Sequence, residues 1–413
     1  MKSTLRPKIL IALTIAVASV TAHGTDIILH SFTDTSTDGD QPHGALTFDG
    51  TSLYGMTVVA GPGGGGIVYR INPDGSGFNI VHGFVPNSPS GGWRPNGSLA
   101  LNGTALYGMT RHGGGVNRGD IFTVNTDGSG YNVLHAFSGT PNDGEMAVGS
   151  LTLSNTILYG MTSTGGSSGF GTVFSLNTDG SAYQVLHSFV GTAGDGKSPN
   201  FGKLTLANSK LYGTTVTGGA SNSGTIYSMN TDGTGFSLVH SFVGGVSEGR
   251  YPYSSDLTLI GSQLYGMTGL GGSNDLGTVF RINLDGANFT MLHSFSGTSS
   301  DGSSPYGSVT SFGSKLYGTT RQGGTNNAGT VFSINLDGSG FSLLNSFTWT
   351  PNDGAFPEGD VIGIGSALYG VTTQGGVGSD FGTVFAIPVV PEPASVSLLG
   401  LGALLLAARR RSA

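Results

Sequence analysis

The residues best able to do chemistry recur at a regular spacing along this chain. Six of the nine histidines occupy equivalent places in a repeat, and Asn345 takes the seventh place. A ring of metal-binding histidines is one interpretation, but each of them falls in the outermost strand of a predicted four-stranded unit. That strand lies roughly 14 Å outside the innermost one, because neighbouring strands are about 4.8 Å apart, so the histidines diverge. We therefore interpret them as packing residues that form hydrogen bonds, and we predict no metal and no cofactor. The six are His30, His82, His135, His187, His240 and His293.

Acidic residues recur as well, four residues before a proline and directly before a glycine. In the second repeat Gly91 stands where the acid is expected, and in the third repeat Asp143 keeps the pattern with Ala147 in the place of proline. This regularity favours a structural turn over a catalytic role. The other acids of the pattern are Asp38, Asp195, Glu248, Asp301 and Asp353.

The residues around these acids differ from one repeat to the next. Variation on an otherwise uniform scaffold indicates where binding is expected. Aromatic rings beside acids and arginines suit sugars, which offer apolar faces and hydroxyl groups, although neutral variation of exposed loops is a competing explanation. The predicted binding residues are His43, Trp93, Arg94, Phe201, Tyr251, Tyr253, Tyr306 and Phe356, joined by Arg111, His112 and Arg321 from a neighbouring set of Gly-Gly loops.

Catalysis on the same face is an alternative. A glycan hydrolase or lyase would use the acids together with His43 or His112. Glycoside chemistry needs two carboxyl groups at a defined separation, which spacing along a chain does not supply. No Ser-His-Asp order, phosphate loop or metal motif stands out in the sequence, so we assign no catalytic residue.

The elements that must position these residues follow from the repeat. The triplet Leu-Tyr-Gly begins seven times, at intervals of 52 or 53 residues. A period near 50 residues is typical of a propeller blade with four strands. Each period contains four short apolar stretches, which in the third period are 150–153, 158–162, 171–176 and 185–189. We predict an all-β, seven-bladed β-propeller with four antiparallel strands in each blade, spanning residues 27–387.

The strand count also predicts how the ring closes. The last repeat ends at 383–387 without a fourth strand, and a spare strand at 28–32 precedes the first repeat. Seven complete blades exist only if this N-terminal strand completes the last blade, which also covers an unpaired edge. The loop that enters each innermost strand and the Gly-Gly loop before each third strand then share one face.

Composition is consistent with this architecture. Glycine provides 74 of the 413 residues, charged residues are only 10%, and there is no cysteine. Abundant glycine with patterned apolar residues favours many short strands and tight turns, and the lack of cysteine excludes disulfides and thiolate sites. Without the two terminal segments the chain has 11 basic and 23 acidic residues. A body this acidic repels phosphate groups, so nucleic acid is not an expected partner.

Both ends of the chain have the pattern of targeting segments. Residues 1–22 combine a basic front, an apolar segment and small residues, which predicts a secretory signal cleaved after Ala22. Residues 388–413 combine a Pro-Glu-Pro triplet, an apolar run at 396–408 and an arginine cluster. As a helix this run rises only about 20 Å, short of the roughly 30 Å hydrocarbon core, and the arginines hold its end on the cytoplasmic side. The residues concerned are Pro391, Glu392, Pro393, Arg409, Arg410 and Arg411.

This C-terminal pattern resembles the PEP-CTERM sorting signal of Gram-negative bacteria. The resemblance implies recognition by an exosortase, contact with the membrane through this segment before processing, and cleavage near the Pro-Glu-Pro triplet. It also implies delivery to the cell surface or extracellular matrix of a bacterium that makes extracellular polysaccharide. A plain tail anchor is the alternative.

The repeats themselves resemble the GloVer tandem repeat of exported, surface-anchored bacterial proteins. The resemblance rests on the pattern LYGTT…GG…GTVFSINLDGSGFSLL at 316–344 and covers nearly all of residues 27–387. It implies no activity and no functional residues. We therefore expect an exported, surface-sorted propeller that acts as an interaction module for extracellular polysaccharide or a surface partner. A glycan hydrolase or lyase, and a purely structural surface protein, are the alternatives.

Overall fold

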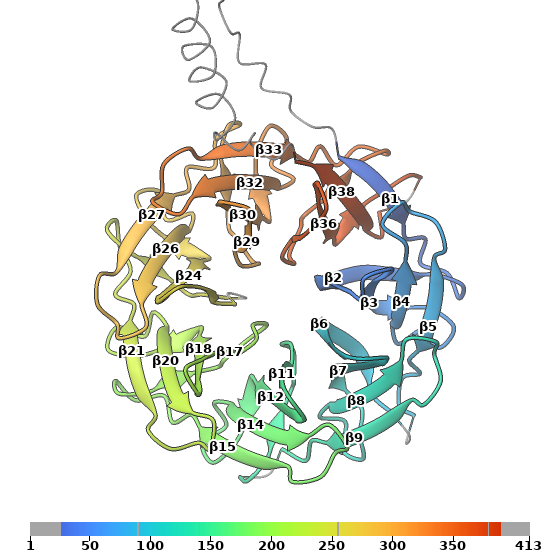
Figure 1. The fold of residues 1–413 in the computed structure, drawn as a ribbon, viewed down its shortest axis with the longest axis horizontal. Coiled ribbons are helices and arrows are strands. Elements are labelled where there is room, and N and C mark those ends of the chain that lie inside the picture. Colours follow the sequence, from blue (N-terminus) through green and yellow to red (C-terminus); the bar gives the residue numbers. More distant parts are fainter. Residues whose placement is uncertain (1–25, 89–90, 140, 254–255, 379, 390–413) are drawn as a thin grey trace, which may run out of the picture.

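The computed structural model describes residues 26–88, 91–139, 141–253, 256–378 and 380–389. Within these ranges the strands form seven four-stranded antiparallel sheets around a central axis (Figure 1), with five additional two-stranded sheets. The predicted all-β, seven-bladed β-propeller is confirmed. The part of the chain that the structure describes contains no helix, and hence none that could cross a membrane. The predicted signal segment and the sorting residues at 391–393 and 409–411 lie outside the described residues.

All seven blades share one strand order from the axis outward (Figure 1). The innermost strands are β2 (Gly39–Phe48), β6 (Trp93–Asn102), β11 (Thr152–Ser154), β17 (Thr205–Ala207), β23 (Thr258–Ile260), β29 (Thr310–Phe312) and β35 (Ile362–Ile364). The second strands are β3 (Leu53–Ala60), β7 (Ala105–His112), β12 (Ile157–Thr162), β18 (Lys210–Thr215), β24 (Gln263–Thr268), β30 (Lys315–Thr320) and β36 (Ala367–Thr372). The third strands are β4 (Ile67–Ile71), β8 (Asp120–Asn125), β14 (Thr172–Asn177), β20 (Thr225–Asn230), β26 (Thr278–Asn283), β32 (Thr330–Asn335) and β38 (Thr383–Pro388). The outermost strands are β5 (Asn79–Gly83), β9 (Asn132–Ala136), β15 (Gln184–Ser188), β21 (Ser237–Ser241), β27 (Thr290–Ser294), β33 (Ser342–Ser346) and β1 (Ile27–Ser31).

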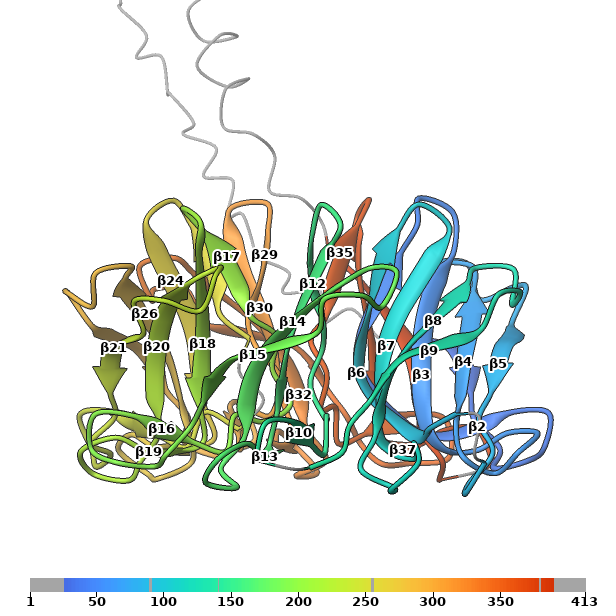
Figure 2. The same cartoon turned by 90° about the horizontal axis from the view of Figure 1, so that it is seen from below.

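The short two-stranded sheets lie together on one face of the ring, at the bottom of Figure 2. Each pairs the loop entering an innermost strand with the Gly-Gly loop of the same blade, as where Gly144 faces Gly165. We call this side of the propeller the loop face, and its two sets of loops are the ones expected to meet. The pairs are β10 (Gly144–Glu145) with β13 (Thr164–Gly165), β16 (Gly196–Lys197) with β19 (Thr217–Gly218), β22 (Gly249–Arg250) with β25 (Leu270–Gly271), β28 (Gly302–Ser303) with β31 (Gln322–Gly323), and β34 (Gly354–Ala355) with β37 (Gln374–Gly375).

The ring closes through its first strand. β1 pairs antiparallel with β38, so that Ile27 faces Ala386 and Ser31 faces Thr383. The N-terminal strand therefore completes the last blade, as the strand count predicts. β38 leads away from the loop face, and the N–H of Val389 beyond it donates to the Ser366 carbonyl in the β35–β36 turn, at 2.8 Å. Both ends of the described propeller consequently emerge on the face opposite the loop face.

The hydrophobic core lies between the blades. One cluster joins Tyr54 and Met56 of the first blade to Leu106 and Phe122 of the second, all of them buried. Gly108 is necessary here because a Cβ atom at this position would lie 2.5 Å from the tip of the Phe122 ring. The glycine after each repeated tyrosine thus makes room for an aromatic ring of its own blade, which then packs on the preceding blade.

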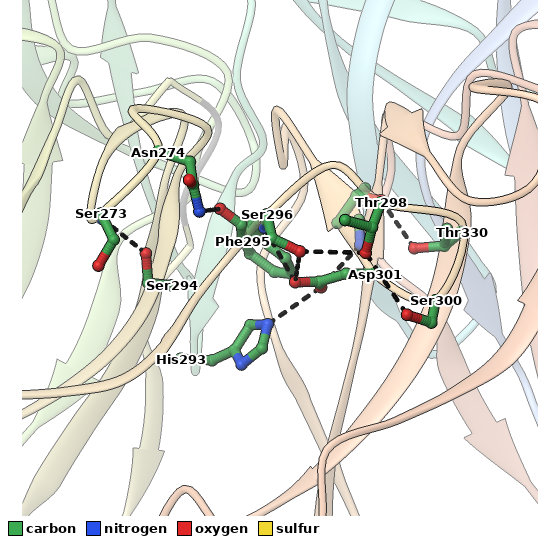
Figure 3. A network of polar contacts seen from close by, with 12 residues as sticks. Ser273, Asn274, His293, Ser294, Phe295, Ser296, Thr298, Ser300, Asp301 and Thr330 are labelled. Atoms are coloured by element: carbon green, nitrogen blue, oxygen red, sulfur yellow. Dashed lines mark hydrogen bonds and ion pairs between the residues drawn. The ribbon is translucent and has the colours of Figure 1, made fainter.

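The repeated histidines and acids meet at the junctions between blades. His293 Nε2 lies 3.0 Å from Asp301 Oδ1 (Figure 3), and the same carboxylate accepts hydrogen bonds from the Ser296 and Gly302 N–H groups. The His293 ring also stacks on Phe341 of the next blade, with 3.9 Å between ring centroids. Four further junctions have the same histidine–acid pair, so the interpretation as hydrogen-bonded packing residues is confirmed for five histidines. The four further pairs are His30–Asp38, His135–Asp143, His187–Asp195 and His240–Glu248. The sixth histidine, His82, stacks on Tyr131 and has Gly91 in the place of its acid.

Candidate functional site

The innermost strands bulge toward the propeller axis. In the first blade the register against β3 shifts between His43 and Thr47, and in the third blade the corresponding residues separate β10 from β11. A Cβ atom at Gly44 would lie 2.2 Å from the Gly97 carbonyl oxygen, so consecutive bulges approach closely only because a glycine stands there. The bulges bring side chains from all blades into a small space at the centre.

The residue before the proline, or before Ala147 in the third blade, starts each bulge in a left-handed conformation. Its φ angle lies between 52° and 56° in every blade, which costs about 1–2 kcal/mol for a residue other than glycine. An interblade hydrogen bond offsets this cost, as where the Tyr251 N–H donates to the Ser223 carbonyl at 2.8 Å. Three predicted binding residues occupy this constrained position. The seven residues are Gln41, Arg94, Met146, Ser198, Tyr251, Ser304 and Phe356.

A second residue of each bulge lies close to the axis, and together these seven residues form a ring that the sequence analysis did not predict. The Ala45 N–H donates to Ser98 Oγ at 2.8 Å, and the Ser98 N–H donates to Ser150 Oγ at 2.8 Å. On the far side of the ring the Ser308 N–H donates to Asp360 Oδ1. The signal in the sequence is a polar residue before the apolar residue that follows the bulge, which six of the seven blades have; the first blade has Ala45 instead. We call this set the axial ring, and its members are Ala45, Ser98, Ser150, Lys203, Asp256, Ser308 and Asp360.

The axial ring contains an ion pair next to a second carboxyl group. Lys203 Nζ lies 3.3 Å from Asp256 Oδ2, and the Lys203 N–H donates to Asp256 Oδ1 at 2.6 Å. Burial and the neighbouring Asp256 charge raise the pKa of Asp360 to about 7, with Lys203 partly opposing them. Near neutral pH, Asp360 therefore exists partly as a carboxylic acid, which donates as well as accepts hydrogen bonds.

Asp256 and Asp360 line an open pocket at the axis, with about 470 Å³ of empty space including the part open to solvent. Three predicted binding residues are brought to it: His43, Phe201 and Tyr306. Polar residues that were not predicted complete the lining. They are Asn96 and Glu358, together with Ser98, Ser150, Asp256 and Asp360 of the axial ring.

Glu358 connects the pocket to the loops around it. Its carboxylate accepts a hydrogen bond from Arg321 Nε at 2.6 Å and lies 3.4 Å from His43 Nδ1. Burial lowers the pKa of His43, and Arg321 lowers it further while Glu358 opposes the change. The lowered pKa of His43 favours its neutral form, and the Arg321–Glu358 pair is balanced in charge.

An aromatic row extends from the pocket across the loop face. The ring of Tyr306 stacks on Tyr253 at 5.5 Å between centroids, and Tyr253 lies 6.0 Å from Tyr251. The Arg321 guanidinium lies over both Tyr306 and Phe356, at 5.6 and 5.3 Å from their ring centroids. Seven of the predicted binding residues thus lie in or next to the axial pocket.

The four remaining predicted residues form a separate group in the second blade. Trp93 faces His112 across β6 and β7, and their rings stack at 4.7 Å between centroids. The Arg94 guanidinium lies 5.2 Å from the Trp93 ring, and Arg111 directly precedes His112. We call these four residues the second-blade cluster. In the described part of the chain, no group of three histidine, aspartate or glutamate residues is placed to hold a metal ion.

The fold defines the chain as a seven-bladed β-propeller with a pocket at its axis, and sequence comparison gives its family. The Gloeobacter/Verrucomicrobia repeat matches residues 16–208 and 192–385 in two tandem copies, and the chain belongs to this family. The PEP-CTERM protein-sorting motif matches residues 389–411. This motif implies exosortase-type sorting and supports export and surface association in Gram-negative bacteria.

Several solved structures are similar to this chain at low sequence identity. An oligogalacturonate lyase in complex with manganese is 13% identical with a TM-score of 0.53, covering 90% of this chain and 99% of that one. A nidogen/laminin complex is 16% identical, with a TM-score of 0.42 and coverage of 67% and 88%. TolB from Acinetobacter baumannii is 14% identical, with a TM-score of 0.43 and coverage of 75% and 65%. No curated protein matches the chain in sequence.

Proposed function

We propose that this surface-sorted propeller is a glycan-binding module that recognises extracellular polysaccharide at its axial pocket. The observation that carries the proposal is the pairing of aromatic rings with hydrogen-bonding groups in one lining. Phe201 and Tyr306 offer apolar surface for the face of a sugar ring, while Ser98, Ser150 and Asp360 offer hydroxyl and carboxyl groups. Pockets that bind small ligands combine apolar walls with a few placed polar groups in this way.

The orientation of the chain ends supports this function. The described propeller begins and ends on the face opposite the loop face, as the pairing of Ile27 with Ala386 and the position of Val389 require. A propeller attached through its C-terminal segment therefore directs its loop face away from the attachment. The aromatic row around Tyr306 then meets the extracellular matrix first.

The charges of the pocket favour an uncharged sugar. Lys203 is paired with Asp256, and Arg321 is paired with Glu358. Asp360 is partly protonated near neutral pH, since its pKa is raised to about 7. A neutral hydroxyl-rich ligand can exchange hydrogen bonds with these groups without leaving a buried charge unpaired.

Binding of uncharged polysaccharides tests the proposal. Isothermal titration with dextran and with the neutral fraction of the host's own matrix should detect binding by the exported chain. Tyr306→Ala and Phe201→Ala should each weaken it about tenfold, a loss of about 1.4 kcal/mol. Ile157→Ala, on the opposite face, should bind like the wild type. Failure of the wild type to bind, or unchanged binding by both pocket variants, would overturn the proposal.

A glycan hydrolase or lyase is the second candidate, because the pocket lining contains three carboxyl groups, those of Asp256, Glu358 and Asp360. Glycosidases separate their two carboxyl groups by about 5 Å or more. Asp256 and Asp360 instead share a hydrogen-bonding contact, and each also binds the backbone of a neighbouring blade. Glu358, the third carboxyl group, is held in an ion pair with Arg321. This arrangement favours binding over cleavage. New reducing ends or unsaturated products, lost in Asp360→Asn, would establish the enzyme instead, whereas a purely structural protein would neither bind nor cleave.

A further inference from the structure

The second-blade cluster contains three N–H donors without acceptors. Trp93 Nε1, Arg94 Nε and Arg111 Nε are covered from solvent, and the described residues provide no hydrogen-bond partner for any of them. A buried donor without a partner is destabilising and rare in native structures, so three in one place are unusual. All three groups are hydrogen-bond donors, so a ligand that binds them must supply acceptor atoms.

The cluster also has an unbalanced charge. Other arginines of the loop face are paired with carboxylates: Arg118 with Glu145, Arg250 with Asp275 and Arg321 with Glu358. Within the described residues, neither arginine of the cluster has a carboxylate at ion-pair distance. The acid that the other blade junctions use is itself replaced here by Gly91.

The two arginines of the cluster both lie near His112 and affect its pKa. Burial lowers the pKa of His112, and the positive charges of Arg111 and Arg94 lower it further. Both guanidinium groups therefore lie near this ring, which stacks on Trp93. Two like charges held close together without a counter-charge repel each other, and a bound anion would relieve this repulsion.

We propose that the second-blade cluster binds the anionic group of an acidic polysaccharide, a carboxylate or a sulfate ester. Arginine is suited to both groups because its planar fork of N–H donors matches their oxygen atoms. Arg94 and Arg111 are partly exposed, so a ligand can reach their outer nitrogen atoms. The cluster is not part of the axial pocket lining, so this inference stands independently of the proposed binding of neutral sugars.

Binding of charged polymers by the exported chain tests the inference. Polygalacturonate presents carboxylates, dextran sulfate presents sulfate esters, and dextran is the uncharged reference. The wild type should bind at least one charged polymer, with an affinity that falls as salt concentration rises. The double variant Arg94→Gln, Arg111→Gln should lose at least tenfold in affinity while its melting temperature stays close to that of the wild type. The polymer that binds identifies the anionic group.

Matched controls separate this site from general charge effects. Arg250→Gln removes an arginine of the loop face that is already paired with Asp275, and it should retain full binding. Trp93→Phe keeps an aromatic ring but removes one of the three donors, so it should weaken binding several-fold. Tyr306→Ala should leave binding of the charged polymer intact. The inference is wrong if neither charged polymer binds, if the double variant binds like the wild type, or if Arg250→Gln loses as much affinity.

Discussion

Asp26 lies beside Asn345 at the junction where the ring closes, within reach of the Asp353 carboxylate. At each of the other six junctions the same two places hold an aromatic ring stacked on a histidine, as with Phe341 and His293. At the closing junction, Asp26 therefore stands in the place of the aromatic residue and Asn345 in the place of the histidine. At this junction Asp26 Oδ2 and Asn345 Nδ2 are buried and have no hydrogen-bond partners among the described residues.

The closing junction should become less stable as pH rises through neutrality. Burial and the negative charge of Asp353 raise the pKa of Asp26 from its ordinary value of 3.8 to about 7. Because the folded-state pKa lies above the unfolded value, this group contributes its full stability below pH 3.8 and loses it as pH rises through about 7. Asp26→Asn should flatten the dependence of melting temperature on pH between 5 and 8.5. An Asp26→Asn curve parallel to that of the wild type would contradict this prediction.

The histidine–acid junctions should be major contributors to stability. Asp301→Asn removes an acceptor for His293 and two backbone N–H groups, so we expect a loss of about 1–3 kcal/mol in urea unfolding. Asp285→Asn, on an exposed hairpin, is the control and should cost less. An equal effect of the two substitutions would argue against the role assigned to the junction.

The Asp301–His293 contact should also make the stability of the protein depend on pH in the acidic range. Burial raises the pKa of Asp301, but the hydrogen bonds from His293 and Ser296 outweigh burial and hold the pKa below its ordinary value. The stability it contributes is thus present above the ordinary carboxyl pKa and is lost as pH falls below that range. Asp301→Asn should accordingly be less sensitive to pH between 5 and 2 than the wild type. This is measured by the unfolding midpoint at each pH.

Deletion of β1 (Ile27–Ser31) should destabilise the whole ring. It removes the partner of β38 and the packing of Ile28 and Leu29 against the two clusters at the closing blade. Full burial of such a side chain contributes roughly 1.5–3 kcal/mol. Both residues are partly buried and the pairing with β38 is lost as well, so the expected loss is several kcal/mol. Ile27→Ser keeps the strand and changes only an exposed side chain, so it should have little effect. An unchanged melting temperature after the deletion would show that the ring does not depend on this closure.

Replacement of Pro391, Glu392 and Pro393 by alanine should prevent sorting. The triplet belongs to the matched PEP-CTERM motif, whose recognition precedes transfer to the cell surface. Cell fractionation and the size of the mature chain measure the outcome. Normal processing and surface delivery of this variant would remove the sorting role from the triplet.

The architecture could be predicted because each blade of a propeller has its own local sequence pattern, which repeats along the chain. The 52- or 53-residue period and the four apolar stretches per period specify blades, and the spare strand at 28–32 specifies how the ring closes. Antiparallel connection then requires the two loop sets to share a face, as the pairing of Gly144 with Gly165 demonstrates. Each of these inferences uses only residues close together in the sequence, or the number of strands in the repeats.

The site depended on tertiary structure, for a physical reason. Lys203 and Asp256 lie in adjacent blades and become partners only when the bulges of those blades converge on the axis. His43 and Glu358 come from opposite ends of the chain and meet only because the ring is closed. In the sequence, such residues look like scattered variation in a repeat. The sequence by itself determined the scaffold and the variable positions, while ring closure decided which of those positions touch, because contact across an axis has no local signature.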